Sequence, residues 1–103
     1  MREINLSKDA ERFLKKLSPK HRRQVVERIL KLSENPLASD TSKLRGYDEY
    51  YRADIGEYRI IYRFSHTAVL VTILGKRNDQ LVAEKLRQYH EQLGMEVELI
   101  FRN

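Results

Sequence analysis

The chain has 103 residues, of which 34% are charged and 41% are apolar. Such a chain forms one soluble domain around a single core, so we expect one domain over residues 1–103. Because the sequence holds no cysteine, it excludes a disulfide framework, a zinc–thiolate site and cysteine catalysis. The N-terminus has no apolar signal segment, and Ala68–Leu74, the longest apolar run, is far shorter than the roughly 20 residues of a membrane helix. These features predict a cytoplasmic protein with no membrane contact.

The charge of the chain is positive and unevenly distributed. Lysine and arginine number 20 against 15 aspartates and glutamates, which gives a net charge of +5. Residues 1–78 hold 17 basic and 10 acidic side chains, whereas residues 79–103 hold 3 and 5. A small basic body favours an anionic partner, most often nucleic acid. A solvated basic surface explains the same balance, so charge alone leaves both interpretations open.

The N-terminal third predicts a strand followed by two helices. Residues 2–6 alternate between polar and apolar, which is typical of a short strand. From residue 8 to 17 the apolar side chains recur at helical spacing, with Ser7 as the N-cap. A second helix begins at Pro19 after the N-cap Ser18 and ends at Asn35, the residue before a proline. The short joint between the helices predicts an antiparallel helical hairpin.

Residues 37–49 are polar and predict a loop with irregular turns. After Tyr50 the apolar period changes to two, which predicts strands at Tyr50–Ile55, Tyr58–Phe64 and Ala68–Leu74. Because the turns between these strands are short, the strands form an antiparallel meander.

The C-terminal part predicts a loop at residues 75–79 and a helix at Leu81–Leu93. Residues 95–101 alternate again, so 94–103 is an additional strand or a tail after a core of about residues 1–93. The complete order is β-α-α-β-β-β-α. We therefore expect an α+β fold in which the helical hairpin packs on one face of an antiparallel sheet and a helix follows at the C-terminus. Tyr58, Tyr62 and Phe64 face the core, while Arg59 and Arg63 lie on the other, exposed face.

Most catalytic signatures are absent from the sequence. There is no glycine-rich phosphate loop, no paired-histidine metal motif and no nucleophile motif, and the carboxylates are scattered. We therefore expect neither a metal nor another cofactor. His21, His66 and His90 are isolated, and we expect them on the surface.

Basic and tyrosine side chains gather between residues 43 and 77. Guanidinium groups bind phosphate through two hydrogen bonds, and aromatic rings stack on unpaired bases. Fixed cations also stabilise the charge that develops when the 2′-hydroxyl of RNA attacks its neighbouring phosphate. The alternative is that the tyrosines pack in the core and the arginines are solvated strand positions. The basic residues of this region are Lys43, Arg45, Arg52, Arg59, Arg63, Lys76 and Arg77.

Four short sequence motifs of this region resemble the RelE/ParE superfamily of bacterial and archaeal toxins. They are Lys-Leu-Arg-Gly at 43–46, Tyr-Arg-Ala-Asp at 51–54, Gly-Glu-Tyr-Arg-Ile-Ile-Tyr at 56–62 and Gly-Lys-Arg at 75–77. The resemblance covers about residues 1–90. It implies the fold of RelE-like microbial ribonucleases and a toxin of a type II toxin–antitoxin module. It further implies an mRNA endonuclease that works on the ribosome without a metal. The partners that it implies are a cognate antitoxin, the ribosome and mRNA, with operator DNA reached only through the antitoxin complex.

The resemblance carries residue roles onto matching positions. It implies Arg52, Arg59 and Arg77 as the catalytic residues. Two positions depart from the RelE pattern: Asp54 replaces a basic residue, and Ala83 replaces a tyrosine. Asp54 is either a base or an ion-pair partner, and we favour the ion pair. The remaining basic side chains, Lys43, Arg45, Arg63 and Lys76, are expected to bind RNA.

Two other functions remain open. A ParE-like toxin has the same fold but binds and poisons DNA gyrase, and its arginines are not catalytic. The two departures favour that alternative, whereas Arg59 and Arg77 together favour the nuclease. A toxin relic that acts mainly by binding its antitoxin is the third interpretation.

Overall fold

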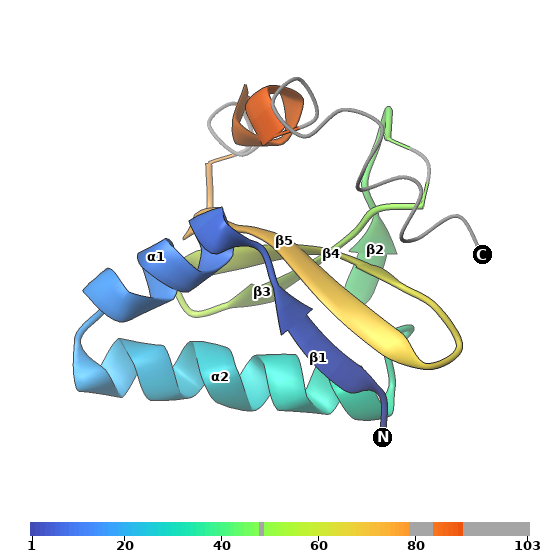
Figure 1. The fold of residues 1–103 in the computed structure, drawn as a ribbon, viewed down its shortest axis with the longest axis horizontal. Helices are drawn as coiled ribbons and strands as arrows, with labels where there is room; N and C mark the ends of the chain where they lie inside the picture. The colour runs from blue at the N-terminus through green and yellow to red at the C-terminus, as the bar shows by residue number, and fades with distance from the viewer. Residues whose placement is uncertain (48, 79–83, 90–103) are drawn as a thin grey trace.

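The computed structural model describes residues 1–47, 49–78 and 84–89 of the chain. In this part the fold is a mixed α+β domain, as the sequence predicts (Figure 1). The elements are β1 (Glu3–Leu6), α1 (Lys8–Lys16), α2 (Pro19–Glu34), β2 (Thr41–Lys43), β3 (Tyr51–Ile55), β4 (Tyr58–Phe64) and β5 (Ala68–Lys76), and residues 84–89 are helical. The ends of the predicted C-terminal helix and the predicted strand at residues 95–101 lie outside the described residues.

The two N-terminal helices begin at the predicted caps. Ser7 accepts a hydrogen bond from the backbone nitrogen of Ala10 at 3.0 Å and donates one to the carbonyl of Thr72 at 2.6 Å. Ser18 accepts from the backbone nitrogen of His21 at 3.4 Å. The guanidinium of Arg22 donates to three carbonyls at the end of α1, where the intrahelical pattern leaves backbone oxygens with few donors. The helical hairpin is therefore fixed at both helix starts and at its joint.

The strand order in the sheet is β1-β5-β4-β3-β2. Strands β3, β4 and β5 form the predicted antiparallel meander, and β2 pairs antiparallel with β3. The prediction of a wholly antiparallel sheet is wrong at one edge, because β1 pairs with β5 in parallel, with Glu3 opposite Ala68. The parallel pairing covers the outer edge of apolar β5 and packs Ile4 and Leu6 against the main core.

Two further local predictions need correction. Residues 41–43, predicted as loop, form β2 and pair with Tyr51–Ala53. A three-residue strand is too short to show a period in the sequence, and its partner supplies most of its stability. Strand β5 also continues past Leu74 to Lys76, because Tyr58 and Arg59 pair with Lys76 and Gly75. This extension places Lys76 beside the turn between β3 and β4.

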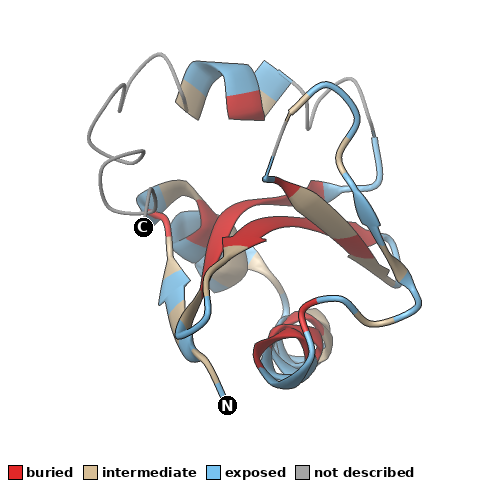
Figure 2. Ribbon diagram, turned by 90° about the vertical axis from the view of Figure 1, so that its right-hand side faces the viewer, coloured by how far each residue is buried: buried red, intermediate tan, exposed pale blue. Residues whose placement is uncertain are grey.

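The sheet is buried on both faces. Figure 2 shows α2 and the helical segment 84–89 on opposite sides of the buried strands. Apolar burial of this kind provides most of the stability of a small domain. The larger core lies between the sheet and the helical hairpin and contains Ala10, Val25, Ile29, Leu32, Ala53, Tyr58, Ile60, Tyr62, Val69, Val71 and Leu74. The smaller core on the other face contains Tyr50, Ile61, Ile73 and Leu86.

The second face is not the exposed surface that the sequence predicts. Arg59 and Arg63 lie on it as expected, but their exposed fractions are only 7% and 5%. The prediction that these arginines are exposed is therefore wrong. Each is buried beside a carboxylate, which is how proteins tolerate a charge away from water. Among the described residues, no helix combines the length and apolar content needed to cross a membrane.

Candidate active site

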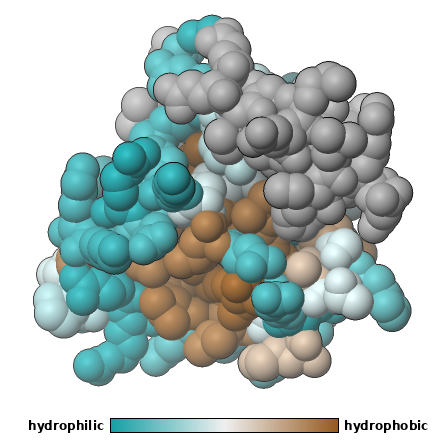
Figure 3. Space-filling model, viewed as in Figure 1, coloured by the Kyte–Doolittle hydropathy of each residue, from teal (hydrophilic) through white to brown (hydrophobic). Residues whose placement is uncertain are grey.

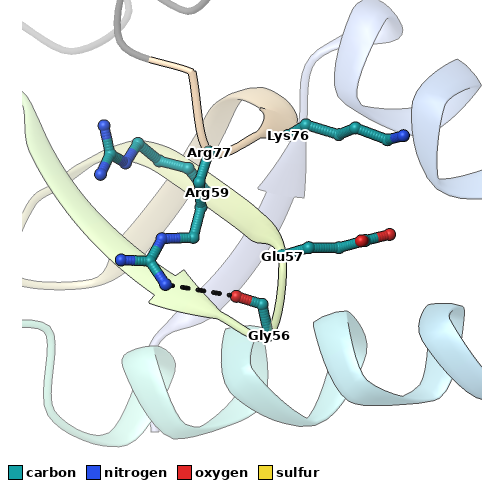
Figure 4. A pocket seen from close by; sticks show the side chains of 5 residues that line it. All are labelled: Gly56, Glu57, Arg59, Lys76 and Arg77. Carbon is teal, nitrogen blue, oxygen red and sulfur yellow. Dashed lines mark hydrogen bonds between the residues drawn. The ribbon is translucent and has the colours of Figure 1, made fainter.

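An open cleft of about 650 Å³ lies beside the turn that joins β3 and β4 (Figure 4). It is lined by Gly56, Glu57, Arg59, Lys76 and Arg77. Three of the basic residues selected from the sequence thus line one cavity: Arg59 comes from β4, Lys76 is the last residue of β5, and Arg77 follows it. The cleft is consequently a place where an anion would meet several fixed cations.

The backbone around the turn positions these side chains. Gly56 has a φ of +56°, a conformation that glycine adopts without strain and that tight hairpins require. The backbone nitrogen of Arg77 donates to the carbonyl of Glu57 at 2.9 Å, so the end of β5 is attached to the turn. Opposite Arg59 on β5 is Gly75, which has no side chain to cover the guanidinium. In Figure 4 the side chains of Arg59 and Arg77 extend to one side, and those of Glu57 and Lys76 extend to the other.

Asp54 joins the two arginines of the cleft. On β3 it lies directly opposite Arg59 of β4. Arg59 donates to it twice, from Nε to Oδ1 at 2.8 Å and from Nη2 to Oδ2 at 3.3 Å. Arg77 Nε lies 3.3 Å from the same Oδ2. Asp54 is therefore an ion-pair partner, as we favoured, but it pairs with Arg59 and Arg77, whereas the sequence suggests its neighbour Arg52.

The charge of this cluster follows from the pKa of Asp54. Partial burial raises the pKa of the Asp54 carboxyl, but the hydrogen bond from Arg59 and the charges of Arg59, Arg77 and Arg52 lower it by more. The net result is a pKa below the ordinary aspartate value. Asp54 is thus ionised at neutral pH, and two guanidinium groups share one internal anion.

The lowered pKa of Asp54 predicts a pH-dependent stability. Because the pKa is lower in the folded chain than in the unfolded one, the stabilisation is complete above about pH 3.9 and disappears as pH falls through the folded-state value. At pH 7 the parent should be more stable than Asp54→Asn by about 1–2 kcal/mol. Urea unfolding from pH 7 down to pH 2.5 measures the difference. A difference that stays constant over this range would show that the charge of Asp54 does not stabilise the fold.

A family model described as "ParE toxin of type II toxin-antitoxin system, parDE" matches residues 4–81. The chain belongs to this toxin family. Solved structures agree with the assignment. A chain of the toxin–antitoxin complex RelBE2 from Mycobacterium tuberculosis is 31% identical, with a TM-score of 0.64 over 74% of this toxin and 98% of that chain.

Two further structures resemble the toxin. A chain of the archaeal RelE–RelB complex from Pyrococcus horikoshii is 26% identical, with a TM-score of 0.64 over 75% of this chain and 96% of that chain. A free variant of the E. coli toxin RelE is 22% identical, with a TM-score of 0.70 over 84% of this chain and 95% of that chain, and it shows the fold alone. No curated protein sequence matches the toxin.

Four of the selected basic residues of the toxin lie outside the lining of the cleft. Arg52 donates from Nε to the hydroxyl of Ser42 at 2.9 Å, on the same sheet face as Asp54. Arg63 is buried, pairs with Glu49 at 2.5 Å and lies 5.3 Å from the centre of the Tyr50 ring. These contacts indicate that Arg63 supports the fold. The other two, Lys43 and Arg45, are exposed at the end of β2 and in the following turn.

One contact near the cleft of the toxin was not predicted. His21, expected on the surface, is half-buried, and its Nδ1 lies 2.7 Å from the hydroxyl of Tyr58 and 4.0 Å from Glu57 Oε1. The contact attaches the start of α2 to the strand that carries Arg59. His66 is exposed as expected. His90 and Ala83 lie outside the described residues. Within the part of the chain that the structure describes, no cluster of His, Asp and Glu side chains is arranged to hold a metal ion.

Proposed function

We propose that this toxin is an endoribonuclease that cuts mRNA on the ribosome and thereby stops translation. The observation that carries the proposal is that Arg59, Lys76 and Arg77 all line one open cleft. An RNA backbone brings one negative phosphate per nucleotide, and guanidinium groups are the side chains best suited to hold it. The sequence motifs that contain these three residues resemble those of RelE toxins, and this resemblance supports RNA as the substrate.

Cleavage needs charge stabilisation more than any other contribution. When the 2′-hydroxyl oxygen bonds to the adjacent phosphorus, the bond from phosphorus to the 5′ oxygen breaks, which leaves a 2′,3′-cyclic phosphate and a 5′-hydroxyl. Negative charge builds on the phosphoryl oxygens during this step, and Arg59 and Arg77 are placed to neutralise it. The proton of the 2′-hydroxyl leaves, and the 5′ oxygen gains one. Among the described residues that line the cleft, Glu57 is our candidate to take the proton of the 2′-hydroxyl, and Lys76 is our candidate to give a proton to the 5′ oxygen.

Asp54 is poorly suited to act as the base. A general base works best when its pKa lies near the operating pH. In the free toxin two arginines hold the pKa of Asp54 below its ordinary value, and that ordinary value is itself far below neutral pH, so the carboxylate has little tendency to take a proton with or without the arginines. Its role in the site is therefore electrostatic.

The proposal predicts that the purified toxin cuts mRNA only when programmed ribosomes are present. Primer extension on an mRNA incubated with the toxin, with and without ribosomes, locates the cuts. The double variant Arg59→Ala/Arg77→Ala is the control for contaminating nucleases. If the purified toxin leaves mRNA intact on programmed ribosomes, although expression of the same chain in cells arrests their growth, the nuclease proposal is wrong.

We further propose a cognate antitoxin as the partner of the toxin. The RelBE2 and RelE–RelB structures are complexes of a toxin with an antitoxin. On this chain apolar side chains gather in the middle of the face seen in Figure 3. Val26 and Leu30 of α2 are 36% and 41% exposed, and they lie one helical turn apart on the same face of the helix. An amphipathic helix of a partly disordered antitoxin suits such a surface.

Gyrase poisoning is the second candidate function. The family model favours it, since ParE toxins of the superfamily act on gyrase. The ion pair of Asp54 with Arg59 also favours it, because the carboxylate reduces the positive charge of the cleft. The order of events after induction separates the two functions. Loss of leucine incorporation before thymidine incorporation supports the nuclease, and the reverse order supports the gyrase poison.

A further inference from the structure

Arg59 and Arg77, which line the cleft, already hold an anion between them, the carboxylate of Asp54. We propose that Asp54 is an internal counter-anion that sets the affinity of the cleft for a phosphodiester. In the free toxin Asp54 holds the two guanidinium groups, and a bound phosphate takes them over. The identity of the ligand as an RNA phosphodiester rests on the proposed function.

The contacts of Asp54 have the form that a phosphate would use. Arg59 presents Nε and Nη2 to two oxygens of one anion, at 2.8 and 3.3 Å. Guanidinium binds carboxylate and phosphate through the same paired donors. Arg77, the residue that follows β5, has its Nε 3.3 Å from Oδ2 of Asp54. A phosphodiester that entered the cleft would therefore compete with Asp54 for the same donors.

Arg59, Asp54 and Arg77 are exposed to solvent to different degrees. We infer from this difference what each side chain does when a phosphate binds. The Arg59 side chain is 8% exposed, whereas Asp54 is 32% and Arg77 is 53% exposed. A buried guanidinium that has lost its water needs an anion beside it at all times. Asp54 supplies that anion when the cleft is empty, and its partial exposure leaves it accessible to exchange. Arg77 lies at the solvent side, where an incoming anion would arrive first.

The charge of the cluster predicts how Asp54→Asn changes the affinity for a phosphodiester. Asp54, Arg59 and Arg77 together carry a net charge of +1 in the parent and +2 when the carboxylate is replaced by an amide. An incoming phosphate then loses a repulsion and gains donors that Asp54 no longer occupies, and the effect is large because the site is partly shielded from water. Asp54→Asn should therefore bind phosphodiesters more tightly, although it removes an interaction that stabilises the fold.

The chain offers a control in a second ion pair of a buried arginine. Arg28 of α2 is 8% exposed and its Nη2 lies 2.9 Å from Oδ1 of Asp40, whose side chain is 66% exposed. Neither Arg28 nor Asp40 lines the cleft. Asp40→Asn changes the net charge of the toxin by the same amount as Asp54→Asn. It therefore separates the local effect from the general increase in positive charge.

Binding of a single-stranded RNA with 2′-O-methyl groups tests the proposal, because such an RNA has no free 2′-hydroxyl and cannot be cut. Fluorescence anisotropy with the full-length toxin should show at least a 10-fold lower Kd for Asp54→Asn than for the parent, and a change of less than 2-fold for Asp40→Asn. The slope of log K against log salt concentration should steepen by about 0.7 in Asp54→Asn, as expected for one additional phosphate contact. Unchanged or weaker binding by folded Asp54→Asn would overturn the proposal.

A measurement on the parent protein covers the case in which Asp54→Asn does not fold. Carboxyl carbon NMR follows the titration of Asp54 with and without the same methylated RNA. The pKa of Asp54 should rise when RNA is bound, because the guanidinium groups then serve the phosphate. An Asp54 titration that saturating RNA leaves unchanged would overturn the proposal. Neither experiment depends on cleavage, so tight binding in a toxin that cuts no mRNA would contradict the proposed function and leave this inference standing.

Discussion

Arg77→Ala should reduce the rate of mRNA cleavage by roughly 30- to 1000-fold and leave the fold almost unchanged. The rate loss corresponds to about 2–4 kcal/mol of transition-state stabilisation, the usual contribution of a charged donor aimed at developing charge. The side chain of Arg77 is 53% exposed, and its contacts with Asp54 and the carbonyl of Gly56 are long, at 3.3 and 3.5 Å. The free energy of unfolding should therefore change by less than about 1 kcal/mol.

Single-turnover cleavage on programmed ribosomes, together with urea unfolding, measures both effects of Arg77→Ala. Arg23→Ala is the matched control, since Arg23 is an exposed arginine of α2 that lies outside the cleft lining. It removes the same charge and should keep the parental rate within about 2-fold. Equal rates for the two variants would remove Arg77 from the active site.

Much of the fold follows from the sequence because the signals are local. The bounds of β4 agree with the alternation of Tyr58–Phe64, and the helices begin at Ser7 and Ser18 because a hydroxyl satisfies the free backbone nitrogens of the first turn. The departures depend on pairing between distant segments. Strand β2 exists through its hydrogen bonds to β3, and β1 is parallel because of the position of β5.

The candidate site shows the same division. The pairing of Asp54 with Arg59 is implicit in the sequence, because a two-residue turn at Gly56 and Glu57 places Ile55 opposite Tyr58 and the preceding residue opposite the following one. The burial of Arg59 is not implicit, since it depends on what covers the second face of the sheet. The contact between His21 and Tyr58 joins residues 37 positions apart and has no signal in either local pattern.

Arg59→Ala should abolish most of the cleavage activity and also destabilise the fold, which distinguishes it from Arg77→Ala. Its rate loss should be at least as large, roughly 100- to 1000-fold, because Arg59 is the more firmly held of the two guanidinium groups. On the sequence alone we expect Arg59 to lie off the core, and its replacement to change stability by less than about 1 kcal/mol. The structure revises that expectation, because the side chain is 8% exposed and donates twice to Asp54.

The size of the destabilisation by Arg59→Ala follows from what remains beside Asp54. Removing one partner of a fully buried ion pair costs about 3–5 kcal/mol. Here Asp54 is 32% exposed and keeps Arg77, so we expect about 1–3 kcal/mol. Arg28→Ala is the control for the loss of a buried arginine: it breaks the pair with Asp40, whose side chain is 66% exposed, so it should cost less stability than Arg59→Ala and should keep the parental cleavage rate. If both variants lost activity equally, the effect of Arg59→Ala would come from weakened folding, and Arg59 would have no direct part in holding the phosphate.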